Sequence, residues 1–340
     1  MIKVSKKGFM TILLSLLVLI VIIVIGNQHL NNRTNNLMDA NTIEIEELVF
    51  DDKKIFINHL NNEMKIYMKS SAGDDRYLGY IFSHFQKELD RDRVDSNYDV
   101  WRLNGVNEYK RIGNKDFKFQ REIVTSGEWE LAIEEVGAND FIGGSVHGDE
   151  INTFVSLKVD GEEKEIGKYL NTEADNVVIK VESDLFRDNT MITDLEKVAT
   201  HNKTYTFNAE GLVLEQEVIF DESLQINRSF LGMLPIIRNK NGEQITDTFI
   251  INDEETKHDV SGEDERETFQ ANKVTIFGED SGVSATVEIL DRSHNISNNF
   301  YVSRSSDYNK LYFTFANNGY ITDVGEVWKQ KTKYEIDIVE

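Results

Sequence analysis

The sequence predicts a mainly β protein: a large antiparallel β-sandwich, of the supersandwich or jelly-roll type, preceded by a transmembrane helix and a short helical segment. Three observations lead to this prediction. Short alternations of apolar and polar residues follow one another from about residue 95 to the C-terminus. Turn residues separate them, and no long helical pattern interrupts them. A parallel α/β fold is disfavoured, because parallel strands need crossover helices.

The alternating segments predict a series of short strands. They cover residues 116–124, 153–159, 177–181, 204–207, 212–220, 225–238, 246–251, 273–277, 284–290, 299–304, 310–315 and 326–339. The dipeptides Asp160-Gly161 and Asn241-Gly242 are typical of two-residue hairpin turns. We therefore expect one antiparallel domain over residues 95–340.

An apolar run near the N-terminus predicts a membrane anchor. Residues 9–25 carry no charge and follow Lys3, Lys6 and Lys7. The run approaches the roughly 20 apolar residues that span a bilayer. We expect a cytoplasmic tail at residues 1–8, a single-pass signal anchor at residues 9–26 and an extracytoplasmic remainder, because lysines stay on the cytoplasmic side. A cleaved signal peptide is the rival interpretation, but no small-x-small cleavage site follows the run.

Residues 27–94 are interpreted as a linker and a helical segment. Phe56, Leu60, Met64 and Tyr67 recur at three or four residues, a helical spacing. A helical pair of this kind would either cover the sandwich or mediate self-association, so a homo-oligomer is one expected state.

Composition limits the classes of partner. The chain has 340 residues, no cysteine and a formal net charge of −23. Disulfides and thiolate metal sites are therefore excluded. The negative charge disfavours binding to nucleic acid and is compatible with cations, neutral sugars or basic partners. Ca²⁺ is the one cofactor that the acidic balance suggests, as a stabiliser of a structural domain.

Residues 127–150 gather aromatic, acidic, imidazole and glycine residues, and this stretch is the first place to look for a site. Trp129 belongs to an alternating strand, which then breaks into a glycine-rich loop. His147, Asp149 and Glu150 follow within that loop. On an extended chain His147 and Asp149 would share a face while Glu150 points away. This spacing suits a histidine polarised by a carboxylate, or two ligands of one metal, although no metal-ligand set is assigned.

The β domain resembles the large sandwiches of carbohydrate-active proteins, namely galactose-mutarotase-like supersandwiches and polysaccharide-lyase sandwiches. The loop DFIGGSVHGDE, the hairpin KTYTFNAEGLVLEQEV and the strand ending MLPIIR carry the resemblance, over about residues 95–340. It implies a polysaccharide ligand. It also implies proton transfer at a sugar ring, by a histidine and a carboxylate or by a tyrosine and an arginine.

The sequence thus predicts a membrane-anchored extracytoplasmic protein that binds or processes polysaccharide. His147 would be the acid or base, Asp149 would orient it, and Arg238 or Arg228 would neutralise a substrate carboxylate. The expected ligand contacts are Trp129, Asp140, Glu150, Arg228 and Tyr301. Whether the protein is an enzyme stays open, with a lyase, a hydrolase and a sugar epimerase as the enzymatic alternatives. The non-enzymatic alternative is a cell-surface module for envelope assembly or adhesion.

Overall fold

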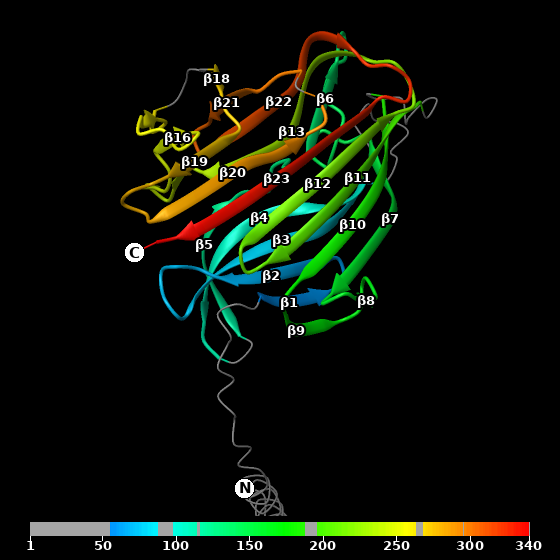
Figure 1. The fold of residues 1–340 in the computed structure, drawn as a ribbon. Coiled ribbons are helices and arrows are strands. Elements are labelled where there is room, and N and C mark those ends of the chain that lie inside the picture. Colours follow the sequence, from blue (N-terminus) through cyan, green and yellow to red (C-terminus); the bar gives the residue numbers. More distant parts are fainter. Residues whose placement is uncertain are drawn as a thin grey trace, which may run out of the picture. The chain divides into compact units, whose positions relative to one another are not determined.

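The computed structural model describes residues 55–87, 98–113, 116–187, 196–262, 268–294 and 296–339. Every regular element in these ranges is a β-strand (Figure 1). The expected cytoplasmic tail and signal anchor, with the linker up to residue 54, lie outside the described residues. None of the described segments is an apolar helix of membrane-spanning length.

One layer of the fold is a run of antiparallel strands. Each strand pairs with the next in the order β8-β7-β10-β11-β12-β23-β20-β19-β16-β17. Their bounds are β8 Glu162–Lys164, β7 Glu150–Val159, β10 Val177–Phe186, β11 Lys197–Asn208, β12 Gly211–Phe220, β23 Val327–Ile338, β20 Val283–Arg292, β19 Lys273–Phe277, β16 Thr248–Ile251 and β17 His258–Asp259.

The second layer is also antiparallel, in the order β9-β1-β2-β3-β4-β5-β13-β22-β21-β18. Strand β6 also pairs with β13, on the same edge as β5. The bounds are β9 Leu170–Ala174, β1 Ile55–Leu60, β2 Glu63–Lys69, β3 Arg76–Lys87, β4 Tyr98–Arg111, β5 Phe117–Val124, β13 Gln225–Ile237, β22 Tyr308–Ile321, β21 Asn299–Arg304, β18 Thr268–Gln270 and β6 Leu131–Glu135. A short parallel contact between β4 and β7 joins the two layers. Strands β14 (Asn239–Lys240) and β15 (Glu243–Gln244) form a separate hairpin.

Both predicted hairpin turns are confirmed. Asp160 and Gly161 connect β7 to β8 with φ values of 51° and 82°, and Asn241 and Gly242 connect β14 to β15 with φ values of 54° and 83°. Two successive positive φ angles define the turn that matches the twist of paired strands, and Asn-Gly and Asp-Gly adopt it most readily.

The helical interpretation of residues 55–87 is wrong, since this segment forms β1, β2 and β3 and pairs with β4. The sandwich therefore begins at least as early as residue 55. The physical reason is burial on both faces of these strands. Phe56, Tyr67 and Tyr77 pack with Tyr109 in a cluster of their own, while their neighbours in sequence fill the main core. Apolar residues on both faces hide the alternation that marks a half-buried strand.

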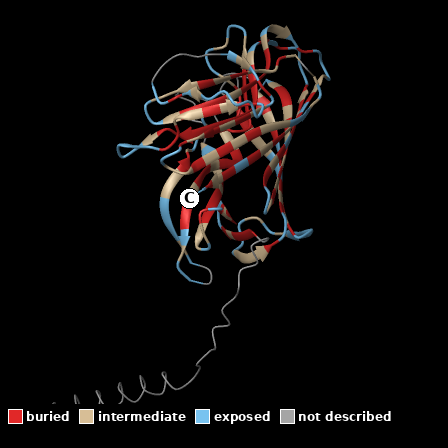
Figure 2. Cartoon of the chain, turned by 60° about the vertical axis from the view of Figure 1, so that its left-hand side comes forward, coloured by how far each residue is buried: buried red, intermediate tan, exposed pale blue. Residues whose placement is uncertain are grey.

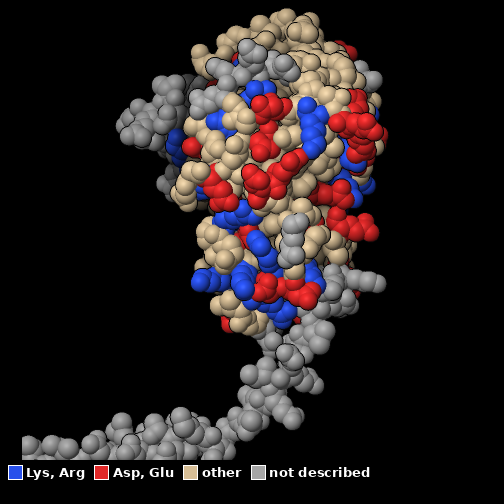
Figure 3. Space-filling view, turned by 90° about the vertical axis from the view of Figure 1, so that its left-hand side faces the viewer, with Lys and Arg blue, Asp and Glu red and all other residues tan. Residues whose placement is uncertain are grey.

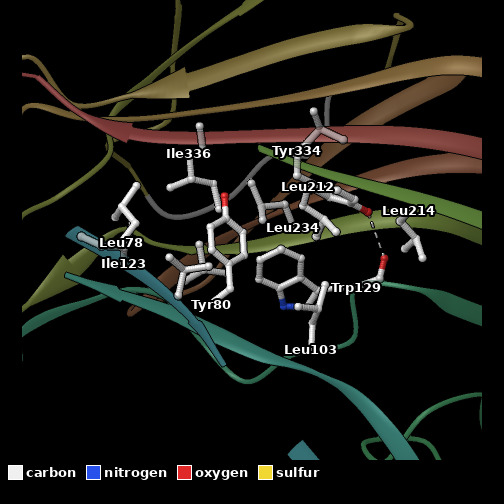
Figure 4. Close-up of a cluster of buried hydrophobic side chains, with 14 of the residues drawn as sticks. Leu78, Tyr80, Leu103, Ile123, Trp129, Leu212, Leu214, Leu234, Tyr334 and Ile336 are labelled. Carbon is white, nitrogen blue, oxygen red and sulfur yellow. Dashed lines mark hydrogen bonds between the residues drawn. The ribbon is translucent and has the colours of Figure 1, made fainter. Parts of the chain in front are cut away.

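The core lies between the two layers. Figure 2 shows buried positions along the strands and exposed ones in the connecting loops. Figure 3 shows acidic and basic side chains interspersed on one outer face. In Figure 4, Tyr334 and Leu212 of one layer lie opposite Tyr80 and Leu103 of the other. Trp129, just before β6, fills the space between them with no exposed surface, and the Tyr334 hydroxyl donates a hydrogen bond to its carbonyl oxygen at 3.4 Å.

Trp129→Ala is expected to destabilise the fold. Removing a buried tryptophan side chain leaves a cavity and should lower the free energy of unfolding by about 3–5 kcal/mol. Urea denaturation followed by circular dichroism measures the change. Phe154→Ala is the matched control, since Phe154 of β7 is 46 % exposed, and its free energy of unfolding should stay within about 0.5 kcal/mol of the parent value. Equal effects of the two substitutions would contradict the placement of Trp129 in the core.

Candidate functional site

An aromatic face lies on the second layer, on the side opposite the core. Along β22, Leu311 faces the core, so Tyr312 points to the other side. Tyr312 stacks on Tyr301 of β21 at 4.8 Å between ring centroids and lies 4.8 Å from Phe230 of β13. Phe141, from the loop between β6 and β7, lies 6.0 Å from Phe230. Phe230 is buried and the other three rings are partly exposed, so Phe141, Phe230, Tyr301 and Tyr312 are called the aromatic face.

Charged groups line one edge of this face. His147 Nδ1 lies 3.1 Å from Asp140 Oδ1, and the imidazole ring lies 4.9 Å from the ring of Phe141. The Arg228 guanidinium lies 4.8 Å from the same ring and is paired with Glu134. Burial lowers the pKa of His147, an effect that Asp140 opposes and that Lys310 and Arg228 reinforce. The imidazole is therefore neutral near pH 7.

Lys310 is a further charged group beside this face. Its Nζ lies 5.1 Å from the centroid of Tyr312, and the residue is only 6 % exposed. The side chain of Lys310 makes no hydrogen bond or ion pair with any residue that the structure describes, although the charges of Glu128 and Glu130 act on it. Burial lowers its pKa to about 8, against the opposing effect of Glu128. Sequence reasoning missed Lys310, although its alternation with Leu311 and Tyr312 was a signal that it leaves the core face.

Backbone N–H groups of the loop that carries His147 donate hydrogen bonds to two buried carboxylates. Glu150 Oε2 accepts from Gly144 N at 2.5 Å, and Glu128 Oε1 accepts from Val146 N. Arg102 Nε donates to Ser145 Oγ at 2.6 Å. These contacts fix the loop against β4 and place His147 over the aromatic face.

Of the two acids, Glu128 is the one whose pKa is raised. It is fully buried, and its Oε2 has no hydrogen-bond partner within the described part of the chain. Burial raises its pKa to about 7, which Arg102 opposes and Glu130 reinforces. Gly144 sits against this carboxylate at a φ of 67°, and an added Cβ would collide with Oε2. Glycine is therefore required at this turn.

Glu150 belongs to a buried ion pair rather than to the ligand-facing surface. Its Oε1 accepts from Lys203 Nζ at 2.5 Å and lies 3.5 Å from His201 Nδ1. Burial opposes ionisation of Glu150, but Lys203 and His201 outweigh it and hold its pKa well below the usual value. Such a pair fixes geometry more than it adds stability.

Four of the predicted site residues come together at the aromatic face: His147, Asp140, Arg228 and Tyr301. The expected pairing of His147 with Asp149 is wrong, because the carboxylate that contacts His147 belongs to Asp140. Asp149 is fully buried and has a φ of 57°. This left-handed conformation breaks the alternation of an extended chain on which the prediction depended.

Three other predicted positions lie away from this surface. Trp129 is in the core and Glu150 is in the buried ion pair. Arg238 is 2 % exposed and donates to the carbonyl oxygens of Gly262 at 2.7 Å and Ser306 at 3.3 Å. A guanidinium engaged with carbonyl groups in this way is placed to hold loops together.

The described ranges show no ligand set for the calcium ion that the acidic composition suggested. Among the residues that the structure describes, no three acidic or imidazole side chains are grouped as ligands of one metal ion.

Comparisons with known proteins yield structural likenesses only. No protein-family model and no curated protein matches the sequence. The fold is similar to a galactose mutarotase-like protein from Clostridium acetobutylicum, with a TM-score of 0.44, 9 % identity, and coverage of 85 % of this chain and 100 % of the other. It is also similar to the α-galactosidase from Lactobacillus brevis, with a TM-score of 0.41, 9 % identity, and coverage of 84 % and 39 %. The expected resemblance was to carbohydrate-active β-sandwich proteins, and both likenesses are of fold alone.

Asp140→Asn is expected to lower the pKa of His147 further. The carboxylate favours the charged imidazolium, and the amide removes that effect. Titration of the histidine ring signals by NMR measures the change. Asp99→Asn, beside His84, is the matched control and should leave the His147 titration in place. An unchanged His147 pKa in Asp140→Asn would show that the pair does not form.

Glu128→Gln is expected to change how stability depends on pH. Because the folded-state pKa of Glu128 is raised, its contribution is complete below the unfolded value of 4.5 and is lost as pH rises through about 7. The glutamine variant never ionises, so its free energy of unfolding should gain on the parent between about pH 5 and 8, by on the order of 2–3 kcal/mol. Urea denaturation across this range measures the difference in free energy of unfolding between the variant and the parent. A difference that stays the same at every pH would contradict the prediction.

Proposed function

We propose that this chain is a membrane-anchored extracytoplasmic protein whose β-sandwich binds carbohydrate at the aromatic face. One observation carries the proposal. Partly exposed rings of Phe141, Tyr301 and Tyr312 lie beside the polar groups of His147 and Asp140. A small-molecule site combines apolar surface with a few convergent polar groups in this manner.

The two parts of the surface match the two sides of a sugar. The C–H groups of a pyranose ring form an apolar face that stacks on an aromatic ring. Hydroxyl groups at the ring edge need donors and acceptors. Because a carboxylate only accepts, the proton lies on His147 Nδ1 toward Asp140, and Nε2 is left to accept from a sugar hydroxyl.

The same geometry offers acid–base chemistry. A neutral imidazole oriented by a carboxylate can take a proton from a bound sugar, as a general base. Binding is the function proposed here, and a depolymerisation assay on every saccharide that binds separates it from the lyase, hydrolase and epimerase alternatives. The extracytoplasmic location rests on the apolar run at residues 9–25, with lysines on its N-terminal side.

Tyr312→Ala is expected to weaken saccharide binding. Loss of one stacking ring should cost about 1–2 kcal/mol, or roughly 5- to 30-fold in affinity. The measurement is a glycan array followed by isothermal titration calorimetry, with the full chain in detergent micelles. Tyr169→Ala is the matched control, since that ring is 65 % exposed and lies outside the aromatic face. A folded parent chain that binds no saccharide would overturn the proposed function.

A further inference from the structure

The hairpin of β4 and β5 is basic, although the chain as a whole is acidic. Its described residues between 110 and 121 include four cations, Lys110, Arg111, Lys118 and Arg121, and Asp116 is the one acid among them. The whole chain carries a formal net charge of −23. This segment, called the basic hairpin, is therefore opposite in charge to the rest of the molecule.

The basic hairpin extends beyond the sandwich. Successive residues of a strand within a layer alternate between a buried and an exposed face. In β5, by contrast, Lys118, Phe119 and Gln120 are all exposed, and full burial begins only toward Val124. Both faces of the strand are thus open near the tip, where Phe119 is 53 % and Ile112 is 64 % exposed. Large apolar side chains interleaved with basic ones are typical of surfaces that bind at the boundary between lipid headgroups and acyl chains.

Ion pairs reduce the charge at the base of the basic hairpin more than at its tip. Arg121 is paired with the buried Glu108 at 2.7 Å, and Lys110 is paired with Asp75 at 2.9 Å. Lys118 is exposed, and no acidic side chain in the described ranges forms an ion pair with it. The tip therefore keeps positive charge that a partner can use.

Aromatic packing fixes the basic hairpin beside the start of β1. Phe117 of β5 stacks on Tyr67 at 3.9 Å between ring centroids and lies 5.5 Å from Phe56. Tyr109 of β4 belongs to the same cluster. β1 is the first described strand and begins at Ile55, next to Phe56. In Figure 1 the hairpin of β4 and β5 extends from the domain beside the start of β1.

The sequence before β1 indicates which surface the basic hairpin meets. Residues 26–54 separate β1 from the apolar run at residues 9–25, the proposed membrane anchor. A segment of this length reaches up to about 100 Å when extended, so it would hold the domain near a bilayer without orienting it. A negatively charged bilayer supplies the orientation, because its surface potential attracts lysine and arginine and repels acidic side chains.

We propose that the basic hairpin docks the domain on the headgroups of an anionic bilayer. Ile112 and Phe119 insert among the headgroups, and Lys118 lies against the lipid phosphates. This inference rests on the membrane anchor of the proposed function and adds the orientation of the anchored domain. The occupant is a lipid surface because the anchor places one within reach and because the charge of the tip is complementary to it.

Docking at the basic hairpin leaves the aromatic face accessible. β5 runs from the tip to Val124, which pairs with Ile236 of β13. Phe230 lies further along β13 in the same direction, because the two strands are antiparallel. The tip and the aromatic face are therefore separated by more than the length of β5, and a saccharide can bind while the domain is docked.

The test measures lipid contact at one exposed position at a time. The chain has no cysteine, so Gln120→Cys in the basic hairpin and Val324→Cys between β22 and β23 each take one fluorophore. Val324 is 70 % exposed and serves as the control position. The full chain is reconstituted into vesicles of phosphatidylcholine, alone or with phosphatidylglycerol, and nitroxide-labelled lipids quench a fluorophore that contacts the headgroups.

The label at Gln120→Cys should be quenched in the anionic vesicles and much less in the neutral ones. Added salt should reduce this quenching, because it screens the surface potential. The label at Val324→Cys should be quenched in neither kind of vesicle.

Variants of the labelled Gln120→Cys chain assign the contact to the tip. Lys118→Gln should lower the ratio of docked to undocked hairpin about fivefold, the effect of one basic residue near an anionic surface. Phe119→Ser should lower it too, because an apolar side chain no longer inserts. Lys180→Gln is the matched control, since Lys180 is exposed on β10 of the other layer, and it should leave the quenching unchanged. The substituted positions are all exposed, so the fold should be retained.

Flotation of the vesicles separates the two proposals. A chain that floats with both kinds of vesicle while the Gln120→Cys label stays unquenched would overturn docking and leave the anchor standing. Equal quenching of both labels, or equal quenching in neutral and anionic vesicles, would also overturn docking. A chain that floats only with anionic vesicles, with the Gln120→Cys label quenched, would support docking and overturn the anchor. A chain that floats with neither kind of vesicle would overturn both.

Discussion

The hydrogen bonds from the Gly144 and Val146 amides to two buried carboxylates are the constraint on which the site depends. Glu128 and Glu150 turn the loop after β6 back over β13 and β22. Without them, the backbone N–H groups of a glycine-rich loop would be solvated and His147 would have no fixed position. The cost of burying these acids is offset by Arg102 on one side and by Lys203 on the other. The polar core is thus a support for the ligand-facing surface.

Many strands after residue 115 could be predicted from the sequence because they have one face in the core and one outside it, whereas β4 was not predicted. Segments such as β12 and β19 show the alternation directly, and the turns at Asp160 and Asn241 depend on local backbone preferences. Strands β1 to β3 could not be predicted in this way. Their outer faces are covered by an aromatic cluster drawn partly from β4. Burial of the outer face by side chains of neighbouring strands removes the alternation of apolar and polar residues.

The candidate site could be predicted only where its residues lie close together in the sequence. The glycines and polar residues of the His147 loop indicated a candidate site in the sequence, and Asp140 lies within the same segment. The identity of the histidine's partner depended on the positive φ of Asp149, which residue type alone does not determine. Lys310 reaches the site through the pairing of β13 with β22, which joins residues far apart in the chain. Side chains brought together by strand register need the sheet topology before they can be grouped.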